Sequence, residues 1–324
     1  MPTTGAETVA RAVPKKRSFL QALTGANSKF GIRQAAWGYA FASPWILGLL
    51  IFTIGPMLFS FYLSFTEYDV LSPAKWVGLK NYQTAFTKDP LFWPSLGRTF
   101  YYAVVSVPLG LAASLLLAVL LNQKLHGTNI FRTMFFLPSM TPAVATVLIW
   151  LWLMNPKIGI LNLVLSKFGF PADFPWYTDK STVIPSLIVM NLWTSAGSNT
   201  MLIFLAALQG VPQELYEAAE IDGAGTWPQF WHITVPMISP ALLFNLVLGI
   251  IGALQVFTSA FVATTGGPAY GSWFFALHIY QQAFQYYRMG YGTALAWIFL
   301  VIVMILTFIN LRLSDRWVYY GGGA

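Results

Sequence analysis

Residues 214–236 read ELYEAAEIDGAGTWPQFWHITVP and lie between two long apolar runs. Four acids fall within nine residues, and the stretch holds no Lys or Arg. This is notable because only 9% of the chain is charged, whereas soluble domains carry roughly 25% charged residues. The fold and the function both depend on where the surrounding apolar runs place this acidic stretch.

Six apolar runs are long enough to cross a bilayer, which takes about 20 residues as a helix. They cover approximately residues 37–65, 99–121, 131–154, 182–208, 241–263 and 291–311 of the 324-residue chain. The runs are continuous rather than alternating, and an open sheet cannot satisfy its backbone in lipid. The sequence therefore predicts an all-α integral membrane protein with six spans. In the first run, we expect a bend at Gly55-Pro56.

Basic residues orient the six spans. Six of the 18 Lys and Arg precede the first run: Arg11, Lys15, Lys16, Arg17, Lys29 and Arg33. Basic segments stay on the cytoplasmic side, and the first helix usually dominates. We expect a cytoplasmic tail at 1–35, a six-span domain at 36–316 and a cytoplasmic tail at 317–324. The acidic loop, at 209–240, then also lies in the cytoplasm.

The spans lack the groups that several kinds of membrane protein need. No Asp, Glu, Lys, Arg or His lies well inside any run, whereas ion-coupled secondary transporters usually need such groups. The chain has no Cys. Its histidines, His126, His232 and His278, lie in loops or at span ends without a carboxylate at metal-ligand spacing. We expect solvated or capping histidines, no metal site and no catalytic residues. The net charge of +7 is attributed to membrane orientation rather than to nucleic-acid binding.

Uncharged polar residues do occur in the fourth and fifth runs. The candidates for a substrate pathway are Asn191, Trp193, Ser195, Asn199, Asn245 and Gln255. Asn191, Ser195 and Asn199 recur every four residues and would share one helical face. They could line a path for a hydroxyl-rich solute, with Trp193 as a stacking surface, or simply join helices by hydrogen bonds. In the second run, Gly110, Ser114 and Ala118 form a stripe of small residues that favours close helix packing.

The acidic loop is interpreted as two short helices. Pro212 suits the first helical position, and Gly223 suits the end. A second helix would start at Thr226, form a capping box with Gln229 and stop before Pro236. The aromatic residues between Trp227 and Trp231 would pack under the first helix or against the spans. Two capped helices are more structure than a simple connection between spans requires. The acids of the loop predict that it docks to a soluble partner with a basic cleft.

Several residues of this loop resemble the "EAA" loop of binding-protein-dependent ABC importer permeases. The matching positions are Glu217, Ala218, Ala219, Asp222, Gly223, Ala224, Phe230, Ile233, Pro236 and Pro240. Val235 stands where that family usually has Leu. The motifs at 78–82 (GLKNY), 132–142, 150–162 and 264–268 (TTGGP) are similar to those of the carbohydrate-uptake branch, the maltose-type and glycerol-phosphate-type permeases. The resemblance covers about residues 36–316.

This resemblance implies a type I importer permease with cytoplasmic coupling helices in the bacterial cytoplasmic (inner) membrane. It implies a second permease subunit, two ATPase subunits and a periplasmic or lipid-anchored solute-binding protein. ATP and Mg²⁺ would bind the ATPases, because this chain has no G-x-x-x-x-G-K-S/T loop. The chain itself would not be an enzyme and would hold no cofactor. The expected ATPase-coupling residues are Glu214, Glu217, Ala218, Ala219, Glu220, Asp222 and Gly223.

The resemblance also bears on the solute, a sugar or oligosaccharide. Solute contacts in relatives come largely from the fourth and fifth spans, which supports the pathway candidates named above. Gly249, Gly252 and Ala253 in the fifth span would leave a wide cavity, suited to a longer saccharide. Maltodextrins, other oligosaccharides, acidic saccharides and glycerol phosphate all remain open. The rival hypotheses are a self-contained secondary transporter and a membrane-bound enzyme.

Overall fold

The computed structural model describes residues 29–123 and 127–319. The chain divides into two compact units, residues 1–60 and 61–324. In the first unit, α2 (Lys29–Leu49) continues through a π-helical turn (Leu50–Ile54) into α3 (Gly55–Ser64). The N–H of Gly55 reaches back to the carbonyl of Leu50. A widened turn thus stands immediately before Pro56, where the expected bend was placed, because a π turn makes room for a ring that lacks an N–H.

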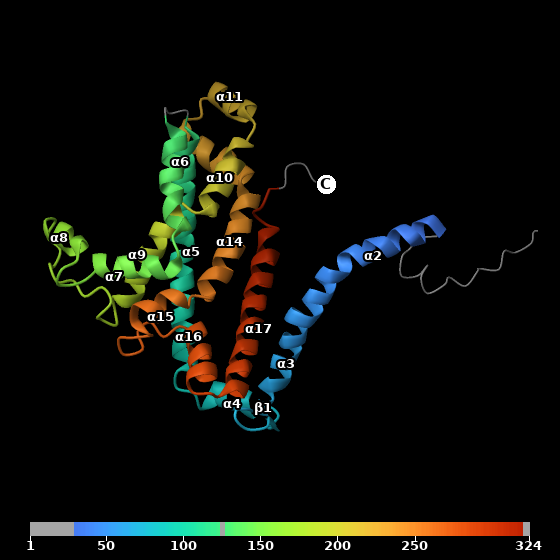
Figure 1. Ribbon diagram of the computed structural model, residues 1–324. Helices are drawn as coiled ribbons and strands as arrows, with labels where there is room; N and C mark the ends of the chain where they lie inside the picture. Colours follow the sequence, from blue (N-terminus) through green and yellow to red (C-terminus); the bar gives the residue numbers. More distant parts are fainter. Residues whose placement is uncertain (1–28, 124–126, 320–324) are drawn as a thin grey trace, which may run out of the picture. The chain divides into compact units, whose positions relative to one another are not determined.

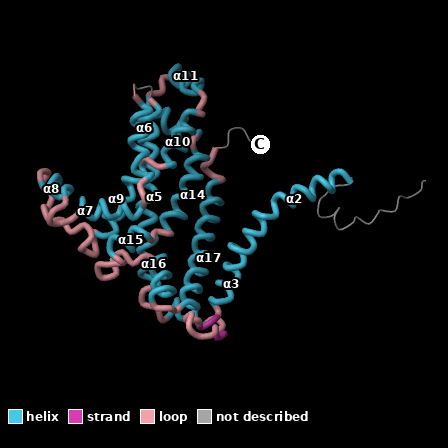
Figure 2. The backbone as a smooth tube through the Cα atoms, in the orientation of Figure 1, coloured by secondary structure: helices cyan, strands magenta, loops and turns pink. Residues whose placement is uncertain are grey.

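The second unit begins within α3 and is almost entirely helical (Figures 1 and 2). Its elements are β1 (Thr66–Glu67), β2 (Lys75–Trp76), α4 (Lys80–Thr87), α5 (Phe92–Asn122), α6 (Thr128–Phe136), a 3-10 turn (Leu137–Met140), α7 (Ala143–Leu153), α8 (Ile160–Ser166), α9 (Val183–Ala196), α10 (Asn199–Gln209), α11 (Gln213–Ile221), α12 (Thr226–Gln229), a π turn (Phe230–Thr234), α13 (Val235–Met237), α14 (Ser239–Leu254), α15 (Thr258–Thr264), α16 (Phe275–Tyr280), a π turn (Gln281–Gln285) and α17 (Met289–Ser314). Strands β1 and β2 pair antiparallel. In Figure 1, α11 lies at one end of this unit, and α4 and β1 lie at the other.

Helix α5 is the central element and packs against α9, α10 and α14. The small residues of α5 permit this close packing. A Cβ added to Gly110 would lie 3.3 Å from the Ser195 hydroxyl oxygen, and the Ser114 hydroxyl donates to the Ser195 carbonyl at 3.0 Å. Ala118 is fully buried in a cluster with Phe204. The packing role predicted for this stripe is confirmed.

Among the described residues, four segments are long and apolar enough to cross a membrane without a sharp bend: Arg33–Ser64, Phe92–Asn122, Ser239–Thr264 and Met289–Ser314. The third of these is interrupted between α14 and α15. The expected runs at 131–154 and 182–208 are instead bent pairs. Helix α7 turns by 96° from the segment Thr128–Met140, and α10 turns by 46° from α9. Thr141 is extended before Pro142, as the residue before a proline prefers. At the second bend, Ser198 is extended and its hydroxyl accepts from the Thr200 N–H as the N-cap of α10.

The second bend sits against the first. A Cβ added to Gly197 would lie 1.8 Å from the carbonyl oxygen of Phe135 in α6. No side chain fits between two backbones at that distance, so only glycine allows α6 and α9 to meet. The two bent spans are therefore held together at a backbone contact.

Replacing Gly197 should test this contact. We expect Gly197→Ala to destabilise the purified protein by about 3 kcal/mol, the upper range for overpacking a closed site. Thermal unfolding in detergent, followed by size-exclusion chromatography, measures the loss. Gly38→Ala is the matched control, because a Cβ at Gly38 meets nothing within 4 Å. Equal stability of the two variants would contradict the contact.

Candidate functional site

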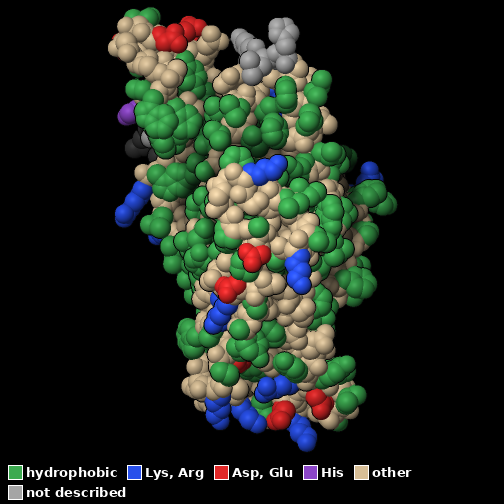
Figure 3. All heavy atoms as spheres, turned by 90° about the vertical axis from the view of Figure 1, so that its left-hand side faces the viewer, with side chains coloured by type: hydrophobic (Ala, Val, Ile, Leu, Met, Phe, Trp, Pro, Cys, Tyr) green, Lys and Arg blue, Asp and Glu red, His purple; other side chains and the backbone are tan. Residues whose placement is uncertain are grey.

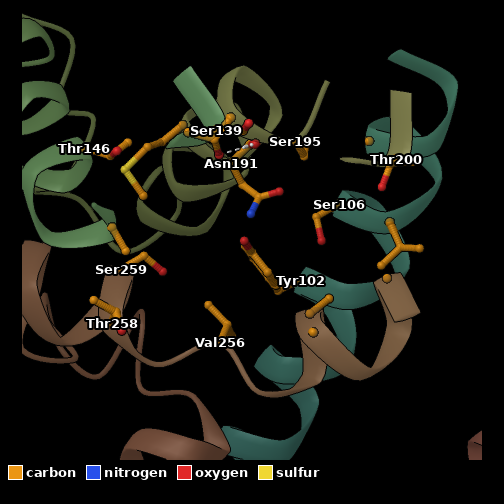
Figure 4. A pocket seen from close by; sticks show the side chains of 18 of the residues that line it. Tyr102, Ser106, Ser139, Thr146, Asn191, Ser195, Thr200, Val256, Thr258 and Ser259 are labelled. Carbon is orange, nitrogen blue, oxygen red and sulfur yellow. Dashed lines mark hydrogen bonds between the residues drawn. The ribbon is translucent and has the colours of Figure 1, made fainter. Parts of the chain in front are cut away.

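Three helix breaks lie around one cavity of about 500 Å³ (Figure 4). These breaks separate α6 from α7, α9 from α10, and α14 from α15. The polar residues of its lining are Tyr102, Ser106, Ser114, Ser139, Thr141, Thr146, Asn191, Thr194, Ser195, Thr200, Asn245, Thr258 and Ser259. Interrupted helices leave backbone N–H and C=O groups without helical partners. Such irregular backbone is tolerated at membrane depth where it borders a cavity.

The lining of this cavity is polar but uncharged. No Asp, Glu, Lys, Arg or His is among the described residues that line it. The side chains of Tyr102 and Asn191 point toward one another across the space, near Ser195 and Ser106 (Figure 4). Hydroxyl groups both donate and accept hydrogen bonds, and an amide offers both functions at once. The cavity is therefore suited to a ligand with many hydroxyl groups. In the part of the chain that the structure describes, no group of His, Asp and Glu could hold a metal ion.

Half of the expected pathway residues lie at the cavity. Asn191, Ser195 and Asn245 line it. Asn245 is only 3% exposed, and its amide donates to the carbonyl of Ala241 at 2.9 Å. Asn245 therefore both lines the cavity and forms a hydrogen bond to the backbone.

The other three pathway residues lie outside the cavity lining. The bend after Ala196 takes Asn199 off the face of Asn191 and leaves it exposed. Trp193 is 60% exposed and meets Trp150 edge-on at 6.3 Å. Gln255 lies exposed in the break between α14 and α15. The prediction that Asn191, Ser195 and Asn199 share one helical face was wrong because it assumed an unbroken helix.

The sequence analysis missed the contribution of α5 to the lining. Tyr102, Ser106 and Gly110 all border the cavity, and Tyr102 is almost fully buried. The available signal was their spacing of four residues, which continues to Ser114. One α5 stripe serves both functions, since its small residues pack against α9 and its polar groups face the cavity.

The acidic loop forms the helix that the sequence predicts. Pro212 is the N-cap of α11 rather than its first residue. At the other end, the Ala224 N–H bonds to the Ala219 carbonyl at 2.8 Å, and the Gly223 N–H bonds to the Glu220 carbonyl at 3.0 Å. With Gly223 at φ +80°, this is a Schellman motif. Gly223 ends the helix as predicted.

The acids of α11 are exposed and point away from the bundle. Glu214, Glu217, Glu220 and Asp222 are all exposed, and none forms an ion pair with a described residue. Figure 3 shows acidic side chains gathered at this end. Ile221, 87% exposed, adds an apolar side chain to the same short helix.

The segment after α11 differs from the prediction. Gly225 is the N-cap of α12, and the Gln229 amide donates to the Ala224 carbonyl, so the capping box is wrong. The helix also passes Pro236, because the π turn Phe230–Thr234 accommodates it. Trp227, 70% exposed, packs on Phe230 and Trp231. The Tyr216 hydroxyl bonds to the Thr234 hydroxyl at 2.8 Å, which ties α11 to the segment leading into α14.

A pair of asparagines tests the geometry of the cavity. We expect Asn191→Leu to lower transport by about tenfold, the effect of losing one hydrogen bond of about 1.4 kcal/mol. Asn199→Leu should leave transport unchanged, because Asn199 does not line the cavity. Initial uptake rates in vesicles containing equal amounts of each variant measure the difference. A loss as large for Asn199→Leu would contradict the assignment.

Comparisons with known proteins agree with this geometry. The chain is 41% identical over 286 residues to the probable ABC transporter permease protein YesP of Bacillus subtilis (strain 168), covering 87% of this chain and 92% of the relative. It is 33% identical to the arabinooligosaccharides transport system permease protein AraP of the same organism, covering 85% and 88%. A permease chain from a crystal structure of a bacterial alginate ABC transporter superposes with a TM-score of 0.77 at 24% identity, covering 90% and 98%. Residues 90–319 match a family described as the binding-protein-dependent transport system inner membrane component. With six apolar segments, a cavity at their breaks and an exposed acidic loop, the chain belongs to this family of ABC transporter permeases.

Proposed function

We propose that this permease passes a sugar or oligosaccharide across the bacterial cytoplasmic membrane in an ATP-driven importer. The uncharged cavity, lined with hydroxyl and amide groups at three helix breaks, carries this proposal. Relatives are named for transport of arabinooligosaccharides, trehalose/maltose and lactose. A saccharide presents hydroxyl groups to such a lining and apolar C–H faces to a ring such as that of Tyr102.

The proposed assembly contains this chain and a second permease subunit, two ATPase subunits and a solute-binding protein. ATP and Mg²⁺ bind the ATPase subunits. Binding of ATP favours one of two arrangements of the permeases, and hydrolysis returns them to the other. The binding protein delivers the sugar from the outer side of the membrane.

The proposed orientation places α11 in the cytoplasm, together with the tails at 1–35 and 317–324. Six spans between 36 and 316 keep both termini on that side, and the coupling loop occupies 209–240. The bias of Lys and Arg in the N-terminal tail supports this arrangement. Residues 1–28 and 320–324 lie outside the described part of the chain.

The proposed coupling element is α11 with the turn after it. Its proposed ATPase-coupling residues are Glu214, Glu217, Ala218, Ala219, Glu220, Asp222 and Gly223. The exposed acids suit a basic cleft, and the exposed Ile221 adds apolar contact area. Because Tyr216 is bonded to Thr234, movement of α11 is transmitted through α13 to α14. Helix α14 carries Asn245 and Gly252 of the cavity, so the coupling loop and the sugar path are mechanically linked.

The proposed cavity is wide on the α14 side. Gly249, Gly252 and Ala253 all line it, and a Cβ at Gly252 would meet nothing within 4 Å. This open space supports an oligosaccharide rather than a single sugar ring. It also gives the size preference a local cause that a substitution can change.

Reconstitution of the complete transporter tests the function. We expect ATP hydrolysis in proteoliposomes to rise severalfold when the binding protein carries its sugar, with uptake of that sugar into the vesicles. The matched control is the same binding protein without sugar. Uptake driven by an ion gradient without ATP, with this chain alone, would instead support a secondary transporter.

Reversing one charge on α11 tests the coupling loop. We expect Glu217→Lys to insert and assemble normally but to lose at least tenfold of the sugar-stimulated ATP hydrolysis, because a lysine would face the basic cleft of the ATPase. Asp173→Lys makes the same charge change at another exposed acid and should retain activity. Normal activity of Glu217→Lys would refute the docking role.

Filling the open side of the cavity tests the size preference. We expect Gly252→Leu to fold normally and to reduce oligosaccharide uptake more than tenfold, with a smaller effect on a monosaccharide. Gly48→Leu in α2 is the control, because a Cβ there also meets nothing within 4 Å and the cavity is elsewhere. A transporter whose wild type accepts only monosaccharides would rule out the wide-cavity interpretation.

A further inference from the structure

A buried polar cluster lies where the loop before α5 meets α16 and α17. The Asp89 carboxylate oxygen Oδ2 is 2.8 Å from His278 Nε2 and 2.5 Å from the Tyr291 hydroxyl. His278 Nδ1 is 3.1 Å from the Trp273 indole nitrogen. His278 is fully buried, and the Asp89 side chain is 8% exposed. The expectation of a solvated or capping histidine is therefore wrong for His278, whose carboxylate partner lies 189 residues earlier in the chain.

The hydrogen bonds of this cluster assign a donor and an acceptor role to the two nitrogens of the His278 ring. An indole N–H can only donate, so His278 Nδ1 accepts from Trp273. The ring proton then lies on Nε2 and is donated to Asp89. Burial raises the pKa of Asp89, but the hydrogen bonds from His278 and Tyr291 outweigh it and hold the pKa below its usual range. The cluster thus joins an indole donor, an imidazole ring and a carboxylate in one chain of hydrogen bonds.

Trp273 in turn holds the loop between α15 and α16. A Cβ added to Gly266 would lie 2.4 Å from the Trp273 ring, so the ring packs directly on the loop backbone. Thr265, Ala269 and Tyr270 have φ of +51°, +44° and +59°. Residues other than glycine seldom adopt such angles, and they persist where surrounding contacts impose them. This loop contains the TTGGP motif at 264–268, to which the coupling and cavity assignments give no role.

The same segment is connected to the cavity lining at both of its ends. Helix α15, which ends where the loop begins, carries the lining residues Thr258 and Ser259. Phe274, next to Trp273, packs edge-on against Tyr102 at 5.4 Å. The Phe275 N–H donates to the Thr99 hydroxyl at 2.9 Å, one turn before Tyr102. The position of Trp273 therefore affects both α15 and Tyr102.

We propose that Asp89, His278 and Trp273 form a positioning relay that fixes the 265–270 loop and, through it, the cavity wall made by α15 and Tyr102. None of the three lines the cavity, so they act through other residues. The relay rests on the proposed function, because its purpose is to keep this wall ready for sugar arriving from the binding protein. Its hydrogen bonds, rather than the volume of the imidazole, are what transport requires.

Substitutions at His278 separate these two contributions. Glutamine can donate its amide N–H to Asp89 and accept from Trp273, whereas phenylalanine keeps the ring and removes both bonds. In the reconstituted transporter, we expect His278→Phe to raise the KM for sugar-loaded binding protein about tenfold, and His278→Gln to stay within about twofold of wild type. Basal ATP hydrolysis should not change in either variant. Gln83→Phe, at an exposed polar residue of α4, is the control, because it introduces the same ring outside the relay, the cavity and the coupling loop.

A spin label gives a readout that does not depend on transport. The chain has no Cys, so Tyr270→Cys, in the half-exposed tip of the loop, provides a single labelling site. We expect an immobile label in the wild-type and His278→Gln backgrounds and a mobile component with His278→Phe. If His278→Phe fails to fold, Trp273→Phe removes the indole donor together with part of the ring that packs on Gly266, and it should also mobilise the label.

Two outcomes would overturn the relay. One is a label equally immobile in all backgrounds with an unchanged KM for His278→Phe. The other is His278→Gln as impaired as His278→Phe, which would show that the ring shape matters and the hydrogen bonds do not. A wild-type transporter without sugar-stimulated hydrolysis would refute the proposed function instead, and the label would still test the relay.

Discussion

The need to satisfy every backbone hydrogen bond within lipid constrains this whole structure. Among the described residues, the apolar segments Arg33–Ser64, Phe92–Asn122 and Met289–Ser314 meet this need without an interruption of the helix. Where the chain leaves helical geometry, at Thr141, Ser198 and the residues between α14 and α15, the irregular backbone borders one polar cavity. The position of the proposed sugar path thus follows from where breaks are permitted, and the hydroxyl and amide side chains there can supply partners for ligand and backbone alike.

The rest of the structure holds these breaks in place. On one side, α5 brings small residues against α9 and polar residues to the cavity. On another, the Tyr216–Thr234 hydrogen bond and the continuous passage from α12 to α14 join the exposed acidic helix to the cavity wall. This permease therefore combines a short, charged and exposed helix, α11, with a bundle of apolar helices suited to lipid. The two are connected by helical turns rather than by a flexible link.

Much of this could be predicted from local sequence features. The length of the apolar runs predicted the membrane segments, and Gly223 predicted the end of α11. The four-residue spacing of small residues in α5 predicted its packing stripe. The bends could not be predicted with the same certainty, because a Pro or a Gly-Ser pair signals irregularity but not an angle of 96° or 46°. Asn199 was misplaced for this reason. The partnership of His278 with Asp89 depends on folding alone, since spacing along the chain carries no information about a contact across 189 residues.

The backbone contact between Gly197 and Phe135 has a consequence for how the cavity adapts. Two segments that touch without intervening side chains cannot slide or separate by small rotamer adjustments, so α6 and α9 must travel together as one rigid piece. Adjustment to solutes of different size then falls to the opposite wall. There, Gly252 of α14 leaves unfilled space, and a substitution at this position can alter capacity without disturbing the bundle. The wall at α6 and α9 stays constant, whereas the wall at α14 is where related transporters can differ.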